Sequence, residues 1–398
     1  MQIENPRVSV VLPVRNEAAH AREFFGPLLN QTYPKDRMEV LVVDGMSEDG
    51  TREIVREYEG GGRREEVGGS RLEVGGGRGE MGGLRRKQAS NLRPQTSNLK
   101  PSASTSPPQT SNLKPLPVIR LLDNPRRQRA PALNVGIRSA TGDVILRVDA
   151  RTIIPEDYVE KCVRTLLATG ADNVGGMQVP IVTRNGSPRK ELTQQAIGIA
   201  LAHPFGIGNA QFRLGKKSGY VDTVYLGCFR REIFDKVGLF DEDAPVISED
   251  SEMNYRIRKA GGKVYFDKSI VAYYHPREGI KDLAKLYFRY GGAKAGNLIK
   301  TKSLTAWRQW VPPLFLCALL VFGTASIFSV AAGCIFAFIL GLYLCVDMIV
   351  SASLAAKHRC WPLFRRLLIV FPTLHFSWAT GFFTRLLQRP KPGEYWGY

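Results

Sequence analysis

Cysteine is scarce in this chain of 398 residues: six are present, and no two of them form a CxxC pair. This spacing argues against a disulfide scaffold and against a structural zinc site. The N-terminus also lacks a basic stretch followed by an apolar one, and the first apolar run, residues 8–14, is too short for a signal peptide. We therefore expect the main body to be retained in a reducing compartment and not secreted.

Acidic residues are nearly absent from the C-terminal part of the chain. Residues 300–398 hold only Asp347 and Glu394 against ten Lys and Arg side chains. The formal charge of the whole chain is +18, and such an excess can indicate nucleic-acid binding. Here, however, the C-terminal excess flanks apolar segments, as basic residues do on the cytoplasmic side of a membrane. The charge pattern therefore favours a membrane as partner and argues against a nucleic acid.

One run of 46 residues, 311–356, contains no Lys, Arg or Glu and a single Asp. A bilayer crossing needs about 20 apolar residues, so this run predicts two spans, near 311–332 and 333–353, that turn at the small residues 331–333. Basic residues on both sides place both ends of this hairpin in the cytoplasm. The run is too long and too apolar for a typical soluble hairpin.

A third apolar stretch, residues 367–383, contains Pro372 and His375 and is followed by basic residues. A full crossing by this stretch would place those basic residues outside, against the usual charge bias. We therefore expect a re-entrant or interfacial segment here, with a third span as the alternative.

Residues 59–116 have a composition unlike the rest of the chain. Glycine runs recur early in this segment, and the pattern Ser-Asn-Leu-Arg/Lys-Pro then appears three times. Such a composition cannot bury enough apolar surface to offset the loss of chain entropy on folding. It predicts a disordered, low-complexity insertion without a function of its own.

The rest of residues 7–300 alternates segments typical of strands with segments typical of helices. The spacing predicts an α/β domain with a mostly parallel sheet. In such sheets the ligand binds beyond the carboxyl ends of the strands. The expected strands are 8–14, 39–43, 118–122 and 144–148, and the expected helices are 18–29, 49–58, 132–139 and 155–168.

Polar side chains follow three of these strands at the edge where a ligand is expected. Pro13, Asn16 and Glu17 end the first strand, Asp44 ends the second, and Asp149 ends the fourth, with Arg151 close behind. Glu17 and Asp49 have a simpler explanation, because each lies at the start of a predicted helix, where carboxylates are favourable. Asp44 and Asp149 follow apolar strands, where an unpaired carboxylate would be costly. They predict a bound sugar, base or cation.

Five segments of the sequence together match a known family: VSVVLPVRNE (8–17), EVLVVDGMSEDGT (39–51), ALNVGI (132–137), ILRVDAR (145–151) and SEDSEMNYR (248–256). In these segments the sequence resembles the family 2 glycosyltransferases, and most of all the membrane-bound succinoglycan-type exopolysaccharide transferases. The resemblance covers residues 7–300 outside the insertion and implies a GT-A fold with helices on both faces of the sheet, followed by a membrane region, 301–398. It also implies a nucleotide-sugar donor, a divalent cation and an inverting displacement.

The same resemblance implies a set of donor-binding residues. Pro13, Asn16, Glu17 and Asp44 match positions that surround the nucleotide, and Asp44 matches the carboxylate that reads the base. Asn134 lies in the matching segment 132–137 and belongs to the same expected set.

Asp149 matches the first Asp of the DxD motif, which contacts the ribose and a divalent cation, Mg²⁺ or Mn²⁺. Arg151 stands where the second Asp is expected. Because such a cation prefers hard oxygen ligands, this departure leaves Asp149 as the one expected metal ligand. It also leaves open that Arg151 itself neutralises phosphate charge.

Asp250 matches the catalytic base of the family, and Glu249 is expected to orient it. One carboxylate must accept the proton of the acceptor hydroxyl while the nucleoside diphosphate departs from the opposite face of the sugar. A simpler explanation of these acidic residues is that they are favourable in the first turn of a helix. Because the other motifs also match the family, we favour Asp250 as the catalytic base. Residues 286–290 lie where processive synthases carry QxxRW, but only Arg289 and an aromatic residue match.

These observations predict a membrane-anchored, inverting glycosyltransferase in the cell inner membrane or plasma membrane, with its catalytic domain in the cytoplasm. It would move a sugar, from a UDP-sugar, to a polyprenyl-linked saccharide in exopolysaccharide or cell-surface glycan synthesis. Two alternatives remain open at this point. One is a processive polysaccharide synthase, and the other is a catalytically inactive, membrane-tethered scaffold.

Overall fold

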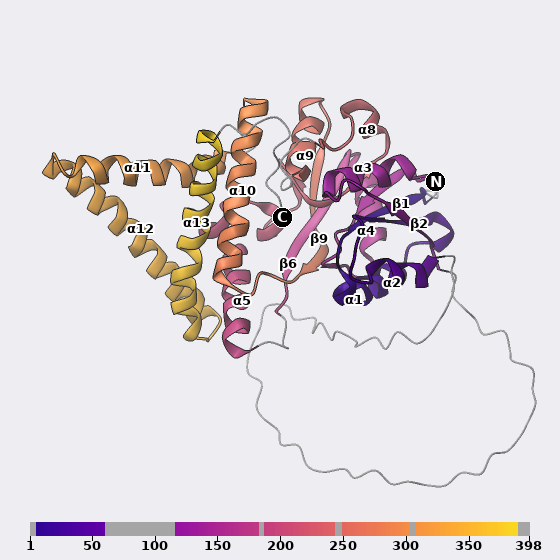
Figure 1. Ribbon diagram of the computed structural model, residues 1–398, viewed down its shortest axis with the longest axis horizontal. Coiled ribbons are helices and arrows are strands. Elements are labelled where there is room, and N and C mark those ends of the chain that lie inside the picture. Colours follow the sequence, from indigo (N-terminus) through magenta and orange to yellow (C-terminus); the bar gives the residue numbers. More distant parts are fainter. Residues whose placement is uncertain (1–4, 60–115, 183–186, 243–248, 303–306, 389–398) are drawn as a thin grey trace, which may run out of the picture.

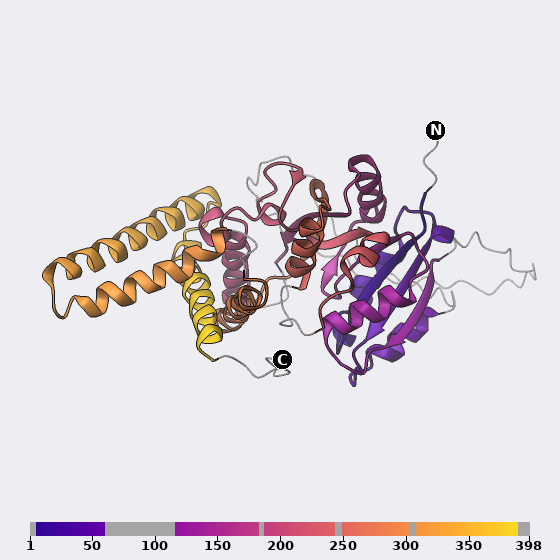
Figure 2. The same cartoon turned by 90° about the horizontal axis from the view of Figure 1, so that it is seen from above.

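The computed structural model describes residues 5–59, 116–182, 187–242, 249–302 and 307–388. A mixed sheet with helices on both sides forms one part of the molecule, and a group of long apolar helices projects from it (Figures 1 and 2). The predicted insertion, 59–116, lies outside the described residues except for its two end positions.

The first four strands pair in parallel, in the order β3-β2-β1-β4. Val8 lies opposite Met38 on one side and opposite Val144 on the other, so the carboxyl ends of β1, β2 and β4 meet at one edge. The strands agree with the predicted ones within a residue at each end: β1 (Val8–Val14), β2 (Met38–Asp44), β3 (Val118–Asp123) and β4 (Val144–Arg147).

The second half of the nine-stranded sheet is mixed. Its path continues β4-β8-β6-β9-β5, with β7 also on β9, and β4 with β8, β8 with β6, β5 with β9 and β7 with β9 are antiparallel pairs. The prediction of a mostly parallel sheet therefore holds for the first four strands, and in the second half β6 and β9 also pair in parallel. These further strands are β5 (Thr152–Ile153), β6 (Asn173–Pro180), β7 (Gly219–Tyr220), β8 (Tyr225–Arg230) and β9 (Val264–Tyr274).

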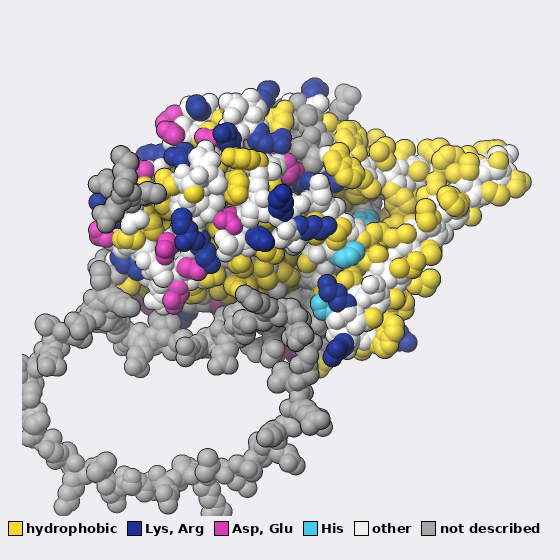
Figure 3. Space-filling view, turned by 180° about the vertical axis from the view of Figure 1, so that it is seen from behind, with side chains coloured by type: hydrophobic (Ala, Val, Ile, Leu, Met, Phe, Trp, Pro, Cys, Tyr) yellow, Lys and Arg dark blue, Asp and Glu magenta, His cyan; other side chains and the backbone are white. Residues whose placement is uncertain are grey.

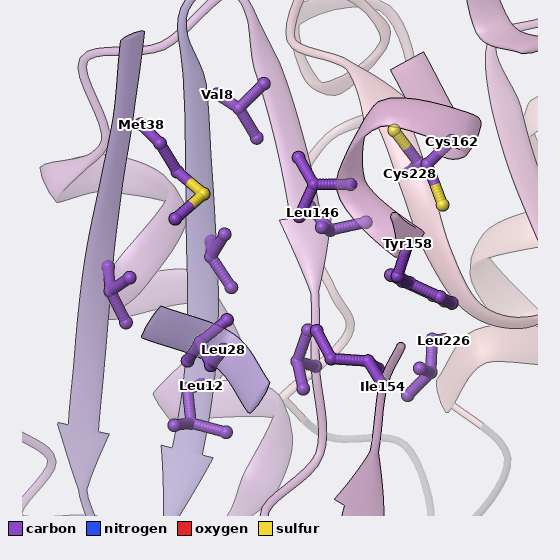
Figure 4. Close-up of a cluster of buried hydrophobic side chains, with 14 of the residues drawn as sticks. Val8, Leu12, Leu28, Met38, Leu146, Ile154, Tyr158, Cys162, Leu226 and Cys228 are labelled. Atoms are coloured by element: carbon purple, nitrogen blue, oxygen red, sulfur yellow. The ribbon is translucent and has the colours of Figure 1, made fainter. Parts of the chain in front are cut away.

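Helices cover both faces of the sheet, which explains why β1 is apolar at nearly every position. Val10 and Leu12 belong to one core with α1, α2 and α4, whereas Val11 belongs to a second core with α3, α8 and α9. Figure 4 shows the first core, where Leu12 and Leu28 lie together. The helices are α1 (Ala18–Leu29), α2 (Thr51–Tyr58), α3 (Arg129–Ser139), α4 (Tyr158–Thr169), α8 (Glu232–Val237) and α9 (Glu249–Lys259).

A third core joins the sheet domain to the C-terminal part of the chain. Its buried side chains include Ile197 of α5, Leu283 of α10, and Leu367 and Phe371 of α13. The helices that contribute to it include α5 (Pro188–Leu201), α6 (Pro204–Ile207), α10 (Ile280–Thr301) and α13 (Pro362–Leu387), whereas α7 (Gln211–Leu214) packs against β6.

Helices α10 and α13 lie side by side (Figure 1) and touch through glycines. A Cβ atom added at Gly291 would lie 1.9 Å from the carbonyl oxygen of Trp378, and one added at Gly381 would lie 1.9 Å from that of Phe288. Only glycine permits this approach of two backbones. Helix α13 is therefore held closely against α10 at these positions.

In the described part of the chain, three helical segments are long and apolar enough to cross a membrane: residues 307–325, residues 330–357 and residues 362–387. The first comprises a short 3₁₀ turn, Trp307–Trp310, and α11 (Val311–Ala325); the second is α12 (Val330–Lys357). Their turn lies at residues 326–329, where the Ser329 hydroxyl caps α12 by accepting from the Ala332 N–H. The predicted turn at residues 331–333 is wrong, because a serine cap outweighs the small residues that follow it.

The α11–α12 hairpin is apolar on its outer surface, as Figure 3 shows. Ile327, Phe328 and Val330 at its tip are each more than three-quarters exposed. Exposed apolar patches of this extent mark a surface that another apolar phase covers. The hairpin is therefore suited to insertion in a bilayer.

Candidate active site

A cavity of about 2220 Å³ opens at the carboxyl ends of β1 and β4. Asp149, Glu249 and Asp250 line one part of it, and Phe315 of α11 and Tyr343 of α12 line another. Pockets for one small ligand usually measure about 300–1000 Å³. This cavity therefore has room for more than one substrate, and it joins the sheet edge to the apolar helices.

Seven of the nine predicted site residues line this cavity, and two do not. The two exceptions are Asp44 and Asn134. The seven are Pro13, Asn16, Glu17, Asp149, Arg151, Glu249 and Asp250.

Asp44 is completely buried, and its carboxylate is already engaged. It accepts hydrogen bonds from the N–H and hydroxyl groups of Ser47, and Arg52 Nη1 donates to it at 2.7 Å. Arg52 also bridges to Asp123 at 2.7 Å. The carboxylate therefore fixes the loop after β2, and its expected contact with a base stays a prediction that would require these bonds to rearrange.

Asn134 lies in the core between α3 and the segment after α8. Its amide oxygen accepts from the N–H of Phe240 at 2.9 Å, and its amide nitrogen donates to the Phe240 carbonyl at 2.8 Å. The same nitrogen donates to Glu242. These bonds engage most of the polar atoms of the Asn134 side chain, which therefore fixes the backbone at Phe240 to α3.

The loop after β1 brings Asn16, Glu17 and Arg151 together. Asn16 has a left-handed backbone, with φ of 52°, and its side chain accepts from the Glu48 N–H at 3.0 Å. Both Glu17 carboxylate oxygens accept from Arg151 Nε at 3.0 Å. Arg151 is 58% exposed on its side chain, so its guanidinium can still reach a ligand in the cavity.

Asp49 caps the helix that follows it. Its carboxylate accepts from the Thr51 N–H at 3.1 Å and from the Ala18 N–H at 3.0 Å. The capping interpretation of Asp49 is therefore the one that the geometry supports.

Arg147, at the end of β4, bridges two acidic residues of the cavity, Asp149 and Glu249. It donates to both oxygens of Asp149, at 2.8 and 3.1 Å, and to Glu249 at 2.7 Å. Arg129 reaches Glu249 from α3 at 3.3 Å. Sequence reasoning missed Arg147, although a single charged residue inside an apolar strand was a signal that could have found it.

Burial opposes the charge on all three carboxylates, but their neighbours differ. Arg147 and Arg129 overcome burial and hold the pKa of Asp149 and that of Glu249 below their usual ranges. Burial, together with the charge of Glu249, raises the pKa of Asp250. A raised pKa makes a carboxylate a better proton acceptor. The arrangement thus separates one basic carboxylate from two that stay ionised.

Two models of known protein families match this chain. The family described as "Glycosyl transferase family group 2" matches residues 144–352, which include Asp149 and Asp250. "Glycosyl transferase family 2" matches residues 9–76. The chain is a family 2 glycosyltransferase.

Relatives of this glycosyltransferase act in exopolysaccharide and glycan synthesis. The succinoglycan biosynthesis protein ExoA of Rhizobium meliloti is 25% identical over 95% of this chain and 94% of its own length. A dolichyl N-acetyl-α-D-glucosaminyl phosphate glucuronosyltransferase of Methanococcus voltae is 22% identical over 96% of this chain and 97% of its own length. The similarity in both cases includes the C-terminal apolar helices.

Among solved structures, a mannosyltransferase of Pyrobaculum calidifontis in complex with GDP-Man and Mn²⁺ superposes with a TM-score of 0.54. It is 18% identical, and the match covers 97% of this chain and 88% of that one. The glycosyltransferase therefore has the GT-A fold that its motifs predicted.

The glycosyltransferase's own side chains do not form a complete metal site. Among the residues that the structure describes, no three His, Cys, Asp or Glu side chains are placed to hold a metal ion. Asp149 is the one carboxylate of the DxD position, and both of its oxygens are bonded to Arg147. The residues present thus do not fit a cation held by the protein alone.

Proposed function

We propose that this glycosyltransferase transfers a sugar, with inversion, from a UDP-sugar to a lipid-linked saccharide at the cytoplasmic face of a membrane. The observation that carries the proposal is the cavity, because it joins the basic carboxylate Asp250 to the apolar helices without interruption. A membrane-embedded acceptor can reach Asp250 along it, while the donor occupies the sheet edge. The relatives' roles in glycan synthesis, one with a dolichyl-phosphate-linked substrate in its name, support this assignment.

Asp250 acts as general base in this proposal. It accepts the proton of an acceptor hydroxyl as that oxygen forms a bond to the anomeric carbon. The bond from the anomeric carbon to the diphosphate breaks on the opposite face, and the nucleoside diphosphate leaves with the electron pair. Glu249 stays ionised because it forms an ion pair with Arg147, and its negative charge helps to raise the pKa of Asp250.

The donor lies among Pro13, Asn16, Glu17 and Asp149 in this proposal, at the carboxyl ends of β1 and β4. Cationic groups there can neutralise the diphosphate: Arg151 is largely exposed, and Arg147 Nη1 is buried without a hydrogen-bond partner among the described residues. A guanidinium is well suited to phosphate oxygens. Release of nucleoside diphosphate from UDP-, GDP- and dTDP-sugars, measured in membranes that contain lipid-linked acceptors, tests the donor, and product length separates single transfer from processive synthesis.

We retain a divalent cation, Mg²⁺ or Mn²⁺, in the proposal, with Asp149 as its protein ligand. The mannosyltransferase with the similar fold was solved with Mn²⁺, and a cation that arrives with the diphosphate needs few ligands from the protein. We expect EDTA to abolish transfer and added Mn²⁺ or Mg²⁺ to restore it. Full activity after chelation would instead assign the neutralisation of the diphosphate to Arg151 and Arg147.

Both ends of the α11–α12 hairpin are proposed to face the cytoplasm, with α13 lying at the interface. The contacts of α13 with α5 and α10 support this placement, because those helices belong to the catalytic side. In a cysteine-free background, a membrane-impermeant thiol reagent applied from outside should label Phe328→Cys. It should miss Lys302→Cys, Arg365→Cys and Gln388→Cys. If Gln388→Cys is labelled in addition to Phe328→Cys, and the other two positions are not, α13 crosses the membrane. Labelling at Arg365→Cys would show that the hairpin has the opposite orientation.

A further inference from the structure

Three charged side chains of the cavity, Arg147, Lys294 and Arg385, have a buried donor atom without a hydrogen-bond partner among the described residues, and Lys294 is the only lysine of the three. Lys294 of α10 is 8% exposed and lines the cavity, and its Nζ has no hydrogen-bond partner among the residues that the structure describes. Removing an ammonium group from water costs several kcal/mol when no partner compensates for it. A lysine kept in this state indicates an anionic ligand.

Two other cations of the cavity are already engaged, so they do not share this feature. Arg308 donates to Asp222 at 2.8 Å and to Asn209 at 2.7 Å. Arg213 donates to the hydroxyl of Tyr274 at 2.8 Å. Lys294 is therefore available to a ligand, as is Arg385 of α13, whose Nε and Nη1 also have no hydrogen-bond partner among the described residues.

Lys294 lies on the acceptor side of the catalytic carboxylates. The charges that act on it are those of Asp250, Arg308, Asp222 and Glu249. Those that act on Asp149, at the donor side, are Arg147 and Arg129. The charges of Arg147 and of Lys294 thus both act on Asp250. Burial lowers the pKa of Lys294 to about 8, so the group is mainly charged at neutral pH.

Helix α10 connects this position to the membrane part of the molecule. Tyr287, Tyr290 and Lys294, spaced by three and four residues, share one face of the helix and line the cavity, and Gly291, which touches α13, lies beside them. Phe205, Phe315 and Tyr343 supply an aromatic wall in the same cavity, with Phe315 and Tyr343 in contact at a ring distance of 4.7 Å. An anionic ligand that also carries an apolar chain would therefore find both a cation and an apolar wall in this cavity.

We propose that Lys294 binds a phosphate group of the polyprenyl carrier, close to the acceptor hydroxyl that Asp250 deprotonates. This inference rests on the proposed function and adds a recognition element to it: the reacting end of the acceptor lies near its lipid phosphate. The aromatic wall receives the first part of the polyprenyl chain. The donor's diphosphate is held separately, on the side of Arg147 and Arg151.

The test compares undecaprenyl phosphate with undecaprenol, its neutral analogue, on the purified full-length protein. The unaltered protein should bind the phosphate more tightly, and Lys294→Met should weaken that binding by about tenfold to a hundredfold, as expected for a hydrogen bond between charged groups. Lys294→Arg should retain most of the affinity. The dissociation constant for UDP should change by less than about twofold, because a change this small corresponds to too little free energy for the loss of a contact. Lys285→Met, an exposed position on the same helix outside the cavity, is the matched control.

Thermal unfolding separates binding from a structural role. Lys294→Met removes an uncompensated buried charge, so its melting temperature should rise by about 2 °C or more without ligand. A fall in melting temperature would assign Lys294 a structural role and overturn the proposal. So would equal binding of undecaprenyl phosphate and undecaprenol, or a loss of UDP binding in Lys294→Met. Inorganic pyrophosphate that competes as well as the lipid would show that free phosphate, and not a lipid, is recognised.

These outcomes are independent of the proposed function. Lipid binding is measured without turnover, so a protein that binds undecaprenyl phosphate through Lys294 but releases no nucleotide would refute the transfer reaction alone. A protein that transfers sugar normally in the Lys294→Met variant would refute the phosphate site alone.

Discussion

Asp250→Asn should lower sugar transfer by roughly a hundredfold to ten-thousandfold, the range for loss of a general base. The amide keeps the shape of the side chain but cannot accept the proton of the acceptor hydroxyl. Donor affinity should hardly change, because the proposed role of Asp250 is toward the acceptor hydroxyl and not toward the donor. The measurement is nucleoside diphosphate release at saturating donor, together with the dissociation constant for UDP.

The pH dependence of the unaltered enzyme provides a second test of this role. Burial and Glu249 raise the pKa of Asp250, so transfer should fall with decreasing pH as this carboxylate becomes protonated, and the fall should begin at a higher pH than for an ordinary aspartate. Asp235→Asn, an exposed position on α8, is the matched control. Near-normal transfer by Asp250→Asn would exclude it as the base.

Arg147→Met should lower the free energy of unfolding by about 3–5 kcal/mol, the range for removal of one partner from a buried ion pair. The substitution leaves Asp149 and Glu249 close together without the guanidinium that bridges them. Transfer should fall as well, because the charge that keeps Glu249 ionised is lost. Thermal unfolding in detergent measures the first effect, and nucleotide release measures the second.

The sign of the pH dependence is fixed by the same contacts. Arg147 lowers the pKa of both carboxylates, so its stabilisation is present above their unfolded pKa values and is lost as the pH falls through the lower folded values. The difference between Arg147→Met and the unaltered protein should therefore shrink in acid. Arg120→Met removes a half-exposed arginine that lies 3.8 Å from Glu39 and should cost less than about 1 kcal/mol. Equal losses for both variants would contradict the bridging role.

The regular part of the fold could be predicted from the sequence because each strand is a short apolar run that ends in polar residues. Strand β1 and helix α1 begin and end where their patterns predicted. The strands of the second half were not predicted. Two of them, β5 and β7, are only two residues long and leave no periodic signal.

The site shows where sequence patterns stop being informative. Strand ends placed Asp149 correctly at the cavity, because position along a parallel sheet fixes which edge a residue reaches. They did not reveal the partners of a side chain: Asp44 bonds to Arg52, and Asn134 to Phe240. Arg147 and Lys294 matter through contacts made or missing in three dimensions, and spacing carries no such information.

The glycine contact between α10 and α13 limits how this enzyme can be divided. Gly291 and Gly381 bring two backbones together so closely that the helix after the membrane hairpin forms a wall of the catalytic cavity. A fragment that stops after α10 would expose Leu283, Ile197 and their neighbours, which α13 now covers. The anchor is thus not an interchangeable module. Recombination that joined this catalytic unit to another membrane tail would have to bring α13 with it.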